Sequence, residues 1–182
     1  TKMAVHREVR RQPSRPNEVW SLDFVHDQLA DGGKFRLLTV IDVFSREALA
    51  IEVGSRLRGE NVVGVLNRLV QQRGAPSHLF VDNGAEFTGH MVDLWAYHRM
   101  VKIDFSRPGK PTDNAYFETF NGSLRDECLN LHWFEDLAEA RRIIEAWRIE
   151  YNESRPHMGL GDLTPTEYAL QARSCYKPTG FN

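Results

Sequence analysis

The sequence predicts an α/β fold in which a mixed five-stranded sheet carries helices on both faces. Three strand-like runs come first and are joined by short turns, which predicts an antiparallel meander. Helical and strand-like segments then alternate, which is typical of strands added in parallel to a sheet. The 182 residues are 41% hydrophobic and 26% charged, as expected of one globular α/β domain with short additions.

The first half of the chain predicts four strands and one helix. The run 19–26 is rich in β-branched and aromatic residues, and the turn at 31–34 separates it from a similar run, 35–42. A third run, 47–53, follows the turn at 44–46. The apolar residues of the next segment recur at helical spacing, and this helix ends at a Gly-Ala-Pro sequence. They are Val62, Val65, Leu66, Leu69 and Val70. The short run 78–81 predicts the fourth strand.

The second half predicts three helices around a fifth strand, 101–105. Thr88 is a candidate cap for a helix that carries Val92, Leu94 and Trp95, whereas 106–113 contains two prolines and a glycine and predicts a loop. One apolar helix face consists of Phe117, Phe120, Leu124 and Cys128, and a second of Leu137, Ala140, Ile144, Trp147 and Tyr151. Asp136 and Glu139 have the spacing of a capping box. This order of elements matches an RNase H-like fold.

Composition limits the class of protein. The net charge of −2 does not indicate nucleic-acid binding, but residues 1–15 contain five basic residues and one acidic residue. We interpret 1–15 as a basic arm or linker that either contacts DNA or is solvated, 16–172 as the core, and 173–182 as a tail. Two cysteines are too few for a disulfide framework or a zinc site. No apolar window of about 18 residues predicts a membrane span, and we expect a cytoplasmic protein. Because the chain starts with Thr, we expect it to be part of a longer one.

Three acidic residues lie where a metal ion could be bound. Asp23 interrupts an apolar strand, where an isolated carboxylate is costly to bury. Asp82 follows a strand at the sheet edge where α/β proteins bind ligands. Glu118 shares a polar helix face with Asn114, Asn121 and Arg125. Phosphodiester chemistry uses such carboxylates to hold two divalent ions about 3.5–4 Å apart. The chain has 25 acidic residues, however, and most acids are solvated surface groups.

The sequences around these acids give the pattern its specificity. VWSLDFVHD, LLTVIDVFSREALA, LFVDNGAEF, SRPGKPTDNAYFETFNGSLRDECLN and YNESRPHMGLGDLTPTEY resemble the transposases of bacterial insertion sequences, which have a retroviral-integrase-type core. The resemblance extends from about Arg15 to Leu170. Thirty-five residues separate Asp82 from Glu118, the spacing of this DDE family, and Arg125 matches a basic position of the family pattern.

The resemblance implies that Asp23, Asp82 and Glu118 are catalytic and bind Mg²⁺ or Mn²⁺, with two ions in the site. The implied reaction cuts DNA at the 3′ end of the element and transfers that end to another phosphodiester. It also implies DNA as the partner, a homo-oligomer, and an N-terminal helix-turn-helix domain or a protein from an upstream reading frame. We expect a nucleoid-associated bacterial protein. Two alternatives remain open: an RNase H-like nuclease that only hydrolyses, and a non-catalytic DNA-binding or assembly remnant.

Several further residues have two interpretations. Arg125 either contacts a DNA phosphate or pairs with an acid. Arg107 and Lys110 are DNA-binding candidates on a loop where solvated cations are equally common. Asn83 either orients a metal-bound water or a DNA base or belongs to a turn beside Gly84, and Asn114 either contacts DNA or caps a helix.

Asp42, His157 and the four tryptophans are given no catalytic role. We expect Asp42 to be structural, and we expect His157 to be a packing residue or a phosphate contact rather than a base. We expect the four tryptophans to be core or subunit-contact residues; they are Trp20, Trp95, Trp133 and Trp147.

Overall fold

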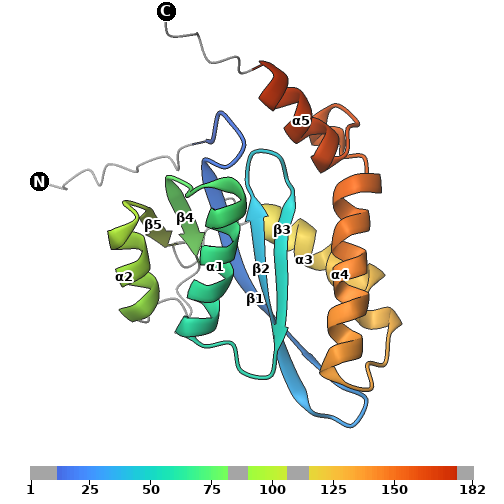
Figure 1. Cartoon of the computed structure of the whole chain (residues 1–182). Helices are drawn as coiled ribbons and strands as arrows, with labels where there is room; N and C mark the ends of the chain where they lie inside the picture. The colour runs from blue at the N-terminus through green and yellow to red at the C-terminus, as the bar shows by residue number, and fades with distance from the viewer. Residues whose placement is uncertain (1–11, 82–89, 106–114, 176–182) are drawn as a thin grey trace, which may run out of the picture.

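The five-stranded sheet has the strand order β3-β2-β1-β4-β5 (Figure 1). The computed structural model describes residues 12–81, 90–105 and 115–175. Side chains are described throughout these ranges except at residues 115–117, where only the backbone is. The strands are β1 (Val19–Gln28), β2 (Lys34–Asp42), β3 (Ala48–Gly54), β4 (His78–Val81) and β5 (Lys102–Phe105). β1, β2 and β3 pair antiparallel, whereas β4 and β5 are added in parallel. The predicted mixed sheet is therefore confirmed.

Helices cover both faces of the sheet in Figure 1. They are α1 (Gly59–Arg73), α2 (His90–His98), α3 (Ala115–Glu127), α4 (Leu137–Ser154) and α5 (Pro165–Cys175), with short 3-10 turns η2 (Leu129–Leu131) and η3 (Met158–Leu160). α1 ends at Gly74, whose φ of 80° favours glycine. α5 reaches Cys175, three residues into the segment that we interpreted as a tail.

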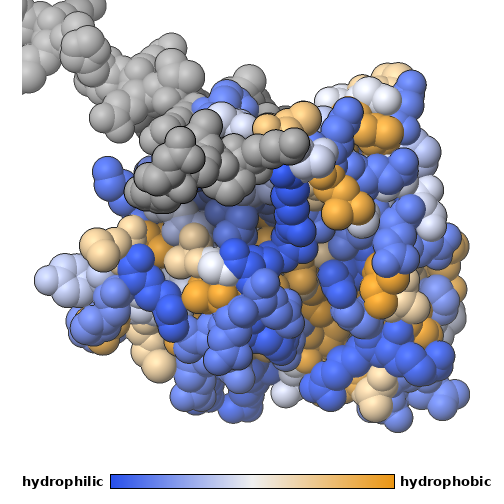
Figure 2. Space-filling view, turned by 45° about the horizontal axis from the view of Figure 1, so that its top comes forward, coloured by the Kyte–Doolittle hydropathy of each residue, from blue (hydrophilic) through white to orange (hydrophobic). Residues whose placement is uncertain are grey.

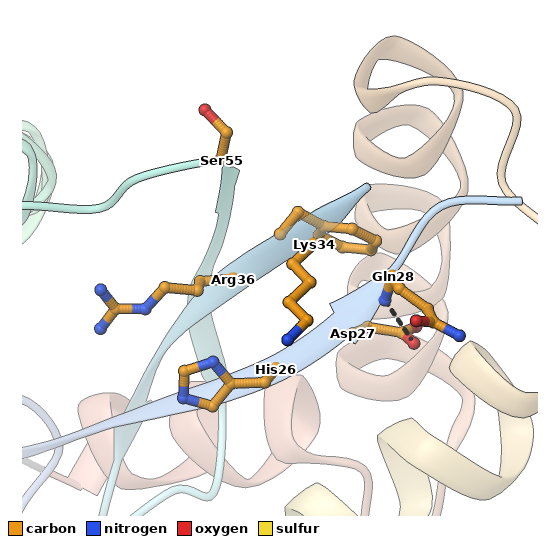
Figure 3. Close-up of a pocket in the computed structure, with 7 residues that line it drawn as sticks. His26, Asp27, Gln28, Lys34, Arg36 and Ser55 are labelled. Carbon is orange, nitrogen blue, oxygen red and sulfur yellow. Dashed lines mark hydrogen bonds between the residues drawn. The ribbon is translucent and has the colours of Figure 1, made fainter. Parts of the chain in front are cut away.

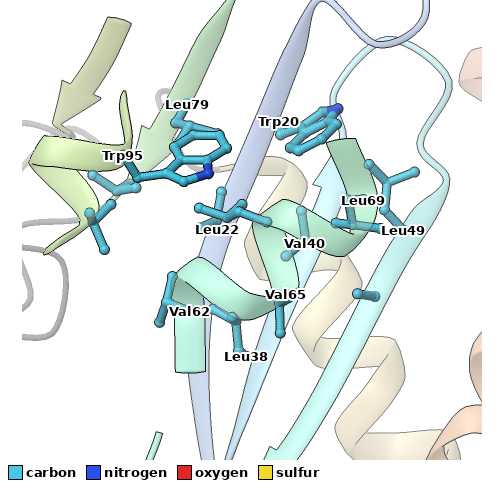
Figure 4. Close-up of a cluster of buried hydrophobic side chains, with 14 of the residues drawn as sticks. Trp20, Leu22, Leu38, Val40, Leu49, Val62, Val65, Leu69, Leu79 and Trp95 are labelled. Atoms are coloured by element: carbon cyan, nitrogen blue, oxygen red, sulfur yellow. The ribbon is translucent and has the colours of Figure 1, made fainter. Parts of the chain in front are cut away.

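Alternation along the strands divides the core into two layers. Trp20 and Leu22 of β1 belong to the layer under α1 and α2, which Figure 4 shows. Val25 of β1 faces the opposite layer, together with Phe120 and Leu124 of α3. Because successive strand residues point to opposite faces, Asp23 shares the face of Val25, on the side of α3. The strand pattern thus decides which helix can meet the Asp23 carboxylate.

The capping prediction for α4 is confirmed with one difference. Asp136 is the N-cap, and its side chain accepts a 2.8 Å hydrogen bond from the backbone N–H of Glu139. The Glu139 side chain accepts from the N–H of Glu135 at 3.3 Å, one residue before the cap. The first hydrogen bond is that of a standard capping box. In the second, the donor is the N–H of Glu135 in place of the N–H of the N-cap residue.

Two apolar side chains that the sequence analysis named lie at the surface. Leu94 is 45% exposed, because α2 turns Val92, Trp95 and Ala96 toward the core instead. Trp133 is 82% exposed and does not belong to the core of this chain, whereas Trp20 and Trp95 are buried and Trp147 packs against the α3–α4 layer.

The surface seen in Figure 2 is mostly hydrophilic, with hydrophobic side chains in small separate groups. Across the described ranges, none of the helices has the length and apolarity that a membrane crossing requires.

Candidate active site

Asp23 lies in the middle of the central strand β1 and is half-buried. One carboxylate oxygen, Oδ1, accepts a 2.8 Å hydrogen bond from the backbone N–H of Phe24. The other, Oδ2, accepts a 2.7 Å hydrogen bond from the side-chain amide of Asn121 on α3. A half-buried carboxylate with both oxygens engaged is held in one orientation, as a metal ligand requires.

The contact with Asn121 brings the helix of Glu118 against β1. Glu118 lies in the first turn of α3, three residues before Asn121, and its side chain is exposed. Residues three apart on a helix are neighbours on its surface, so Glu118 lies one turn from the contact with Asp23. The predicted polar face of α3 is confirmed at Asn121, because that side chain turns toward β1 and not into the core.

Asp82 lies outside the described residues, but the strand that leads to it is well defined. Val81, the last residue of β4, pairs with Leu22 in the parallel ladder. Leu22 directly precedes Asp23, and Val81 directly precedes Asp82 in the sequence. The described backbone therefore brings the end of β4 beside the Asp23 segment of β1.

The described carboxylates suit a hard divalent cation. Mg²⁺ prefers oxygen ligands and usually keeps several of its waters, so a half-buried and an exposed carboxylate on facing elements are suitable donors. Among the described residues, no group of three His, Cys, Asp or Glu side chains lies close enough to hold a metal. Two of the three predicted ligands, Asp23 and Glu118, lie within these ranges.

Arg125 continues the same face of α3 beyond Asn121. Its Nη2 donates a 3.4 Å hydrogen bond to the backbone carbonyl of His26 on β1, and its side chain is exposed. It makes no ion pair with an acid in the described part of the chain. The four other DNA-binding candidates lie outside the described residues; they are Asn83, Arg107, Lys110 and Asn114.

A cavity of about 590 Å³ opens beside the far ends of β1 and β2, and Figure 3 shows its lining. His26, Lys34 and Arg36 contribute basic or imidazole groups, and His26 pairs with Arg36 across the two strands. Arg36 lies 4.2 Å from the ring centre of Phe24, which is a cation–π distance. The strand that holds Asp23 therefore leads to a surface with basic side chains.

Asp42 is structural, as the sequence analysis predicted. It is fully buried, and its carboxylate accepts hydrogen bonds from the backbone N–H of Asn17 at 2.9 Å and from the Ser45 hydroxyl at 2.6 Å. Burial raises the pKa of Asp42 above its ordinary value of 3.8, although these hydrogen bonds act in the opposite direction. The residue fixes the turn between β2 and β3 and makes none of its described contacts with Asp23.

Comparisons with known proteins agree with this geometry. The sequence model described as "Integrase core domain" matches residues 13–111, and a second of the same description matches residues 99–165. This chain belongs to the integrase core domain family.

Its relatives in sequence are proteins of bacterial insertion elements. A 31.7 kDa protein of insertion element IS407 from Burkholderia multivorans is 48% identical over 170 residues, 93% of this chain and 61% of that protein. The putative transposase InsK of IS150 from Escherichia coli is 30% identical over 160 residues, 87% of this chain and 56% of that protein. The chain thus spans less than two thirds of the length of these relatives.

A solved structure confirms the fold. The catalytic core domain of HTLV-2 integrase, in complex with magnesium, superposes with a TM-score of 0.68 at 17% identity, covering 87% of this chain and 99% of that one. The integrase core is thereby established as the fold of this chain, in agreement with the RNase H-like order of elements.

Sequence reasoning missed the role of Asn121. It placed this residue on the face of Glu118 but assigned it no contact. A polar residue one turn after a candidate metal ligand, on the face that meets the strand, is the signal that could have identified it.

Proposed function

We propose that this integrase core domain is the catalytic core of a DNA transposase, in which Asp23, Asp82 and Glu118 form the metal-binding triad. The hydrogen bond between Asn121 and Asp23 is the observation that carries the proposal, because it joins the helix of Glu118 to the strand of Asp23. The pairing of β4 with β1 supports the third position. Membership of the integrase core family supports the reaction class.

The proposed reaction has two displacements at phosphorus. Water first attacks a phosphodiester at the element end, the bond from phosphorus to the 3′ oxygen breaks, and a 3′-OH is released. That hydroxyl then attacks a second phosphodiester, and the target's own 3′ oxygen leaves. When two divalent cations are bound, they stabilise the charge on the attacking and leaving oxygens. Asp23, Asp82 and Glu118 would hold the cations, and Asn121 would keep the Asp23 carboxylate in its orientation.

Arg125 is the proposed DNA contact among the described residues. It is exposed, lies two turns after Glu118 on the same helix, and its one described hydrogen bond, to the His26 carbonyl, is long at 3.4 Å. A cation in this position can bind a backbone phosphate beside the reacting one. Arg107, Lys110, Asn83 and Asn114 stay candidates from the sequence.

The rest of the functional assembly is also part of the proposal. Two element ends must be brought together, so we propose that the protein acts as a homo-oligomer on transposon ends and target DNA. Because the relatives are longer than this chain, an N-terminal DNA-binding region, or a protein from an upstream reading frame, would recognise the ends. The place of action would be the bacterial nucleoid.

Cleavage and joining with oligonucleotides test the proposal. The chain is incubated with Mn²⁺ and duplexes that carry the element ends, intact or already cut. We expect joined products from the wild type and none from Asp23→Asn, Asp82→Asn or Glu118→Gln, with unchanged circular dichroism. Asp126→Asn, an exposed acid on α3, is the matched control and should keep its activity.

The outcomes separate the competing functions. Hydrolysis with no joined product would favour a nuclease, and retained joining in Asp23→Asn would refute the triad. Mn²⁺ titration followed by electron paramagnetic resonance adds a readout that is independent of activity. Wild-type protein should bind the ion, and Asp82→Asn should bind it much more weakly, whereas no binding by either would favour a non-catalytic remnant.

A further inference from the structure

A second cavity, of about 230 Å³, opens at the first turns of α3. Four separate segments supply its polar lining: Arg46 from the β2–β3 turn, Thr119 from α3, Tyr151 from α4, and His157 at the start of η3. Phe120 and Leu160 supply buried apolar walls. None of the described residues that line it is acidic.

The ring nitrogen Nε2 of His157 is buried. It has no hydrogen-bond partner among the described residues. The ring packs edge-on against Tyr151 with centroids 5.2 Å apart, and the His157 backbone N–H donates to the carbonyl of Leu163 at 3.0 Å. The ring is therefore fixed, and a buried polar atom that lacks a partner indicates a ligand or a water.

Arginines surround this histidine. Burial lowers the pKa of His157, and the charges of Arg155 and Arg46 lower it further. Arg155 forms an ion pair with Glu127 and donates to the Ser123 hydroxyl at 3.1 Å, so its charge is partly compensated. Arg46 lies close enough to Tyr151 to favour ionisation of the phenol, although burial raises the Tyr151 pKa to about 12. The described lining of the cavity thus includes one guanidinium group together with hydroxyl and imidazole groups, which are groups that bind a singly charged anion.

The backbone at Arg46 has an unusual conformation. Its φ is 66°, in the left-handed region that non-glycine residues rarely adopt. Such strained conformations concentrate at ligand-binding sites. The turn is anchored by Asp42 and Ser45, whose side chains hydrogen-bond at 2.6 Å. The Arg46 backbone N–H also donates to the Asp42 carbonyl at 2.9 Å, so the backbone of this turn is fixed beside the cavity.

We propose that this cavity binds a phosphodiester group of DNA through Arg46, His157 and Thr119. The inference deepens the proposed function and rests on it. DNA is favoured over other anions because Thr119 is exposed and directly follows Glu118, so the cavity opens beside the proposed catalytic residue. Backbone phosphate contacts fix the position of DNA on a protein without reading its sequence. Arg46 and His157 are positioning residues in this scheme, and neither touches the reacting atoms.

Two variants remove the contacts with little change of shape. Arg46→Asn removes the cation and keeps a residue that tolerates a positive φ. His157→Phe keeps an aromatic ring against Tyr151 and removes the nitrogen. Arg142→Gln, an exposed position on α4, is the matched control for loss of one positive charge.

Binding of a fluorescent duplex of about 30 base pairs, without divalent ions, is the first measurement. We expect Arg46→Asn and His157→Phe each to weaken binding about tenfold. For Arg46→Asn the slope of log affinity against log salt should also fall by about one. Arg142→Gln should keep the wild-type affinity and slope. Equal affinities and slopes in all four proteins would overturn the inference.

Nuclear magnetic resonance of the His157 ring gives a second, direct measurement. Inorganic phosphate should shift the His157 Cε1–H signal of the wild type in a saturable way, and Arg46→Asn should abolish the shift. The absence of a shift, or a shift caused only by a poly-glutamate peptide, would overturn the DNA assignment. Both measurements are independent of cleavage, so they separate a failure of this inference from a failure of the proposed catalysis.

Discussion

The side-chain amide of Asn121 donates a 2.7 Å hydrogen bond to Oδ2 of Asp23, which joins α3 to the central strand across 98 positions of sequence. The backbone N–H of Phe24 occupies the other carboxylate oxygen at 2.8 Å. Asp23 therefore has a fixed orientation before any cation arrives. Because the carboxylate is already ordered, binding a cation would cost less side-chain entropy than it would for a freely rotating carboxylate.

Replacing Asn121 should weaken metal binding more than it weakens the fold. We expect Asn121→Ala to lower the Mn²⁺ affinity about 10- to 100-fold, because the residue orients a ligand without being one. Titration with Mn²⁺ under electron paramagnetic resonance measures this, and Asn130→Ala, an exposed position on η2, is the control. Unchanged Mn²⁺ affinity in Asn121→Ala would show that the hydrogen bond has no part in the site.

Asn152 should be a large contributor to stability. Its Oδ1 accepts from the Ala48 N–H at 2.7 Å, and its Nδ2 donates to the Ala48 carbonyl at 2.9 Å. β3 is an edge strand, and its register with β2 shifts between Val40 and Ile41, beside Ala48. The Asn152 side chain therefore supplies backbone hydrogen bonds to Ala48 that a neighbouring strand would otherwise supply. Arg148 also donates to the Ala48 carbonyl, so in Asn152→Ala mainly the Ala48 N–H would lose its hydrogen-bond partner.

Urea unfolding should give a loss of about 1–3 kcal/mol for Asn152→Ala. Glu153→Ala, the exposed neighbour on α4, should change the free energy of unfolding by less than about 0.5 kcal/mol. A loss for Asn152→Ala no larger than that of the control would contradict the role assigned to this side chain.

The two cysteines should react at very different rates. Cys128 is 1% exposed, and burial raises its pKa to about 11, with a further contribution from Asp27. At pH 8 about one thiol in a thousand is then ionised, whereas Cys175 is exposed at the end of α5. Ellman's reagent should titrate one thiol in the native chain and two in guanidinium chloride. Cys175→Ser should leave no rapidly reacting thiol, and two rapid thiols in the native wild type would contradict the packing of Cys128.

Asp42 should make stability depend on pH. Because its folded-state pKa lies above the ordinary 3.8, the folded state keeps this proton to a higher pH than the unfolded state. The contribution of Asp42 to the free energy of unfolding therefore falls as pH rises from about 4 through the folded-state pKa, and is constant above it.

Urea unfolding of wild type and Asp42→Asn across this range checks the sign. The variant has no titratable proton at this position, so the difference between the two proteins follows the titration of Asp42. The wild-type advantage should be largest at the acid end and decline as pH rises. Asp126→Asn, a change at an exposed acid, should show no such decline, and an advantage that grows with pH for Asp42 would reverse the assignment.

The sequence predicted the fold because its signals are local. The strand 78–81 and the apolar face of Val62, Val65, Leu66 and Leu69 are present in the structure, since alternation and helical spacing follow directly from backbone geometry. The strand limits moved by up to two residues. Trp133 is exposed, so of its two interpretations only the subunit contact stays a prediction; hydrophobicity alone does not distinguish a core residue from an exposed one.

The candidate site was predictable only in part. The motifs predict Asp23 and Glu118 as site residues, but the Asn121 contact and the cavity of Arg46 and His157 depend on how separate elements dock. Arg46 lies in a turn 111 positions before His157, and no local pattern relates the two. Contacts of that kind depend on side-chain directions in three dimensions, which spacing along one element does not encode.

The two elements that carry the proposed site, β1 and α3, differ in how easily each can open locally. This strand is hydrogen-bonded on both sides, to β2 and to β4, so exposing its backbone requires nearly complete unfolding of the sheet. α3 contacts that strand through side chains, at Asn121 and Arg125, and can separate from it in a smaller opening. A cation shared by Asp23 and Glu118 would link β1 to α3. Because the cation would bind only when α3 is in place, its binding would stabilise α3 against local opening. Metal occupancy would then set how long the assembled site persists between encounters with DNA.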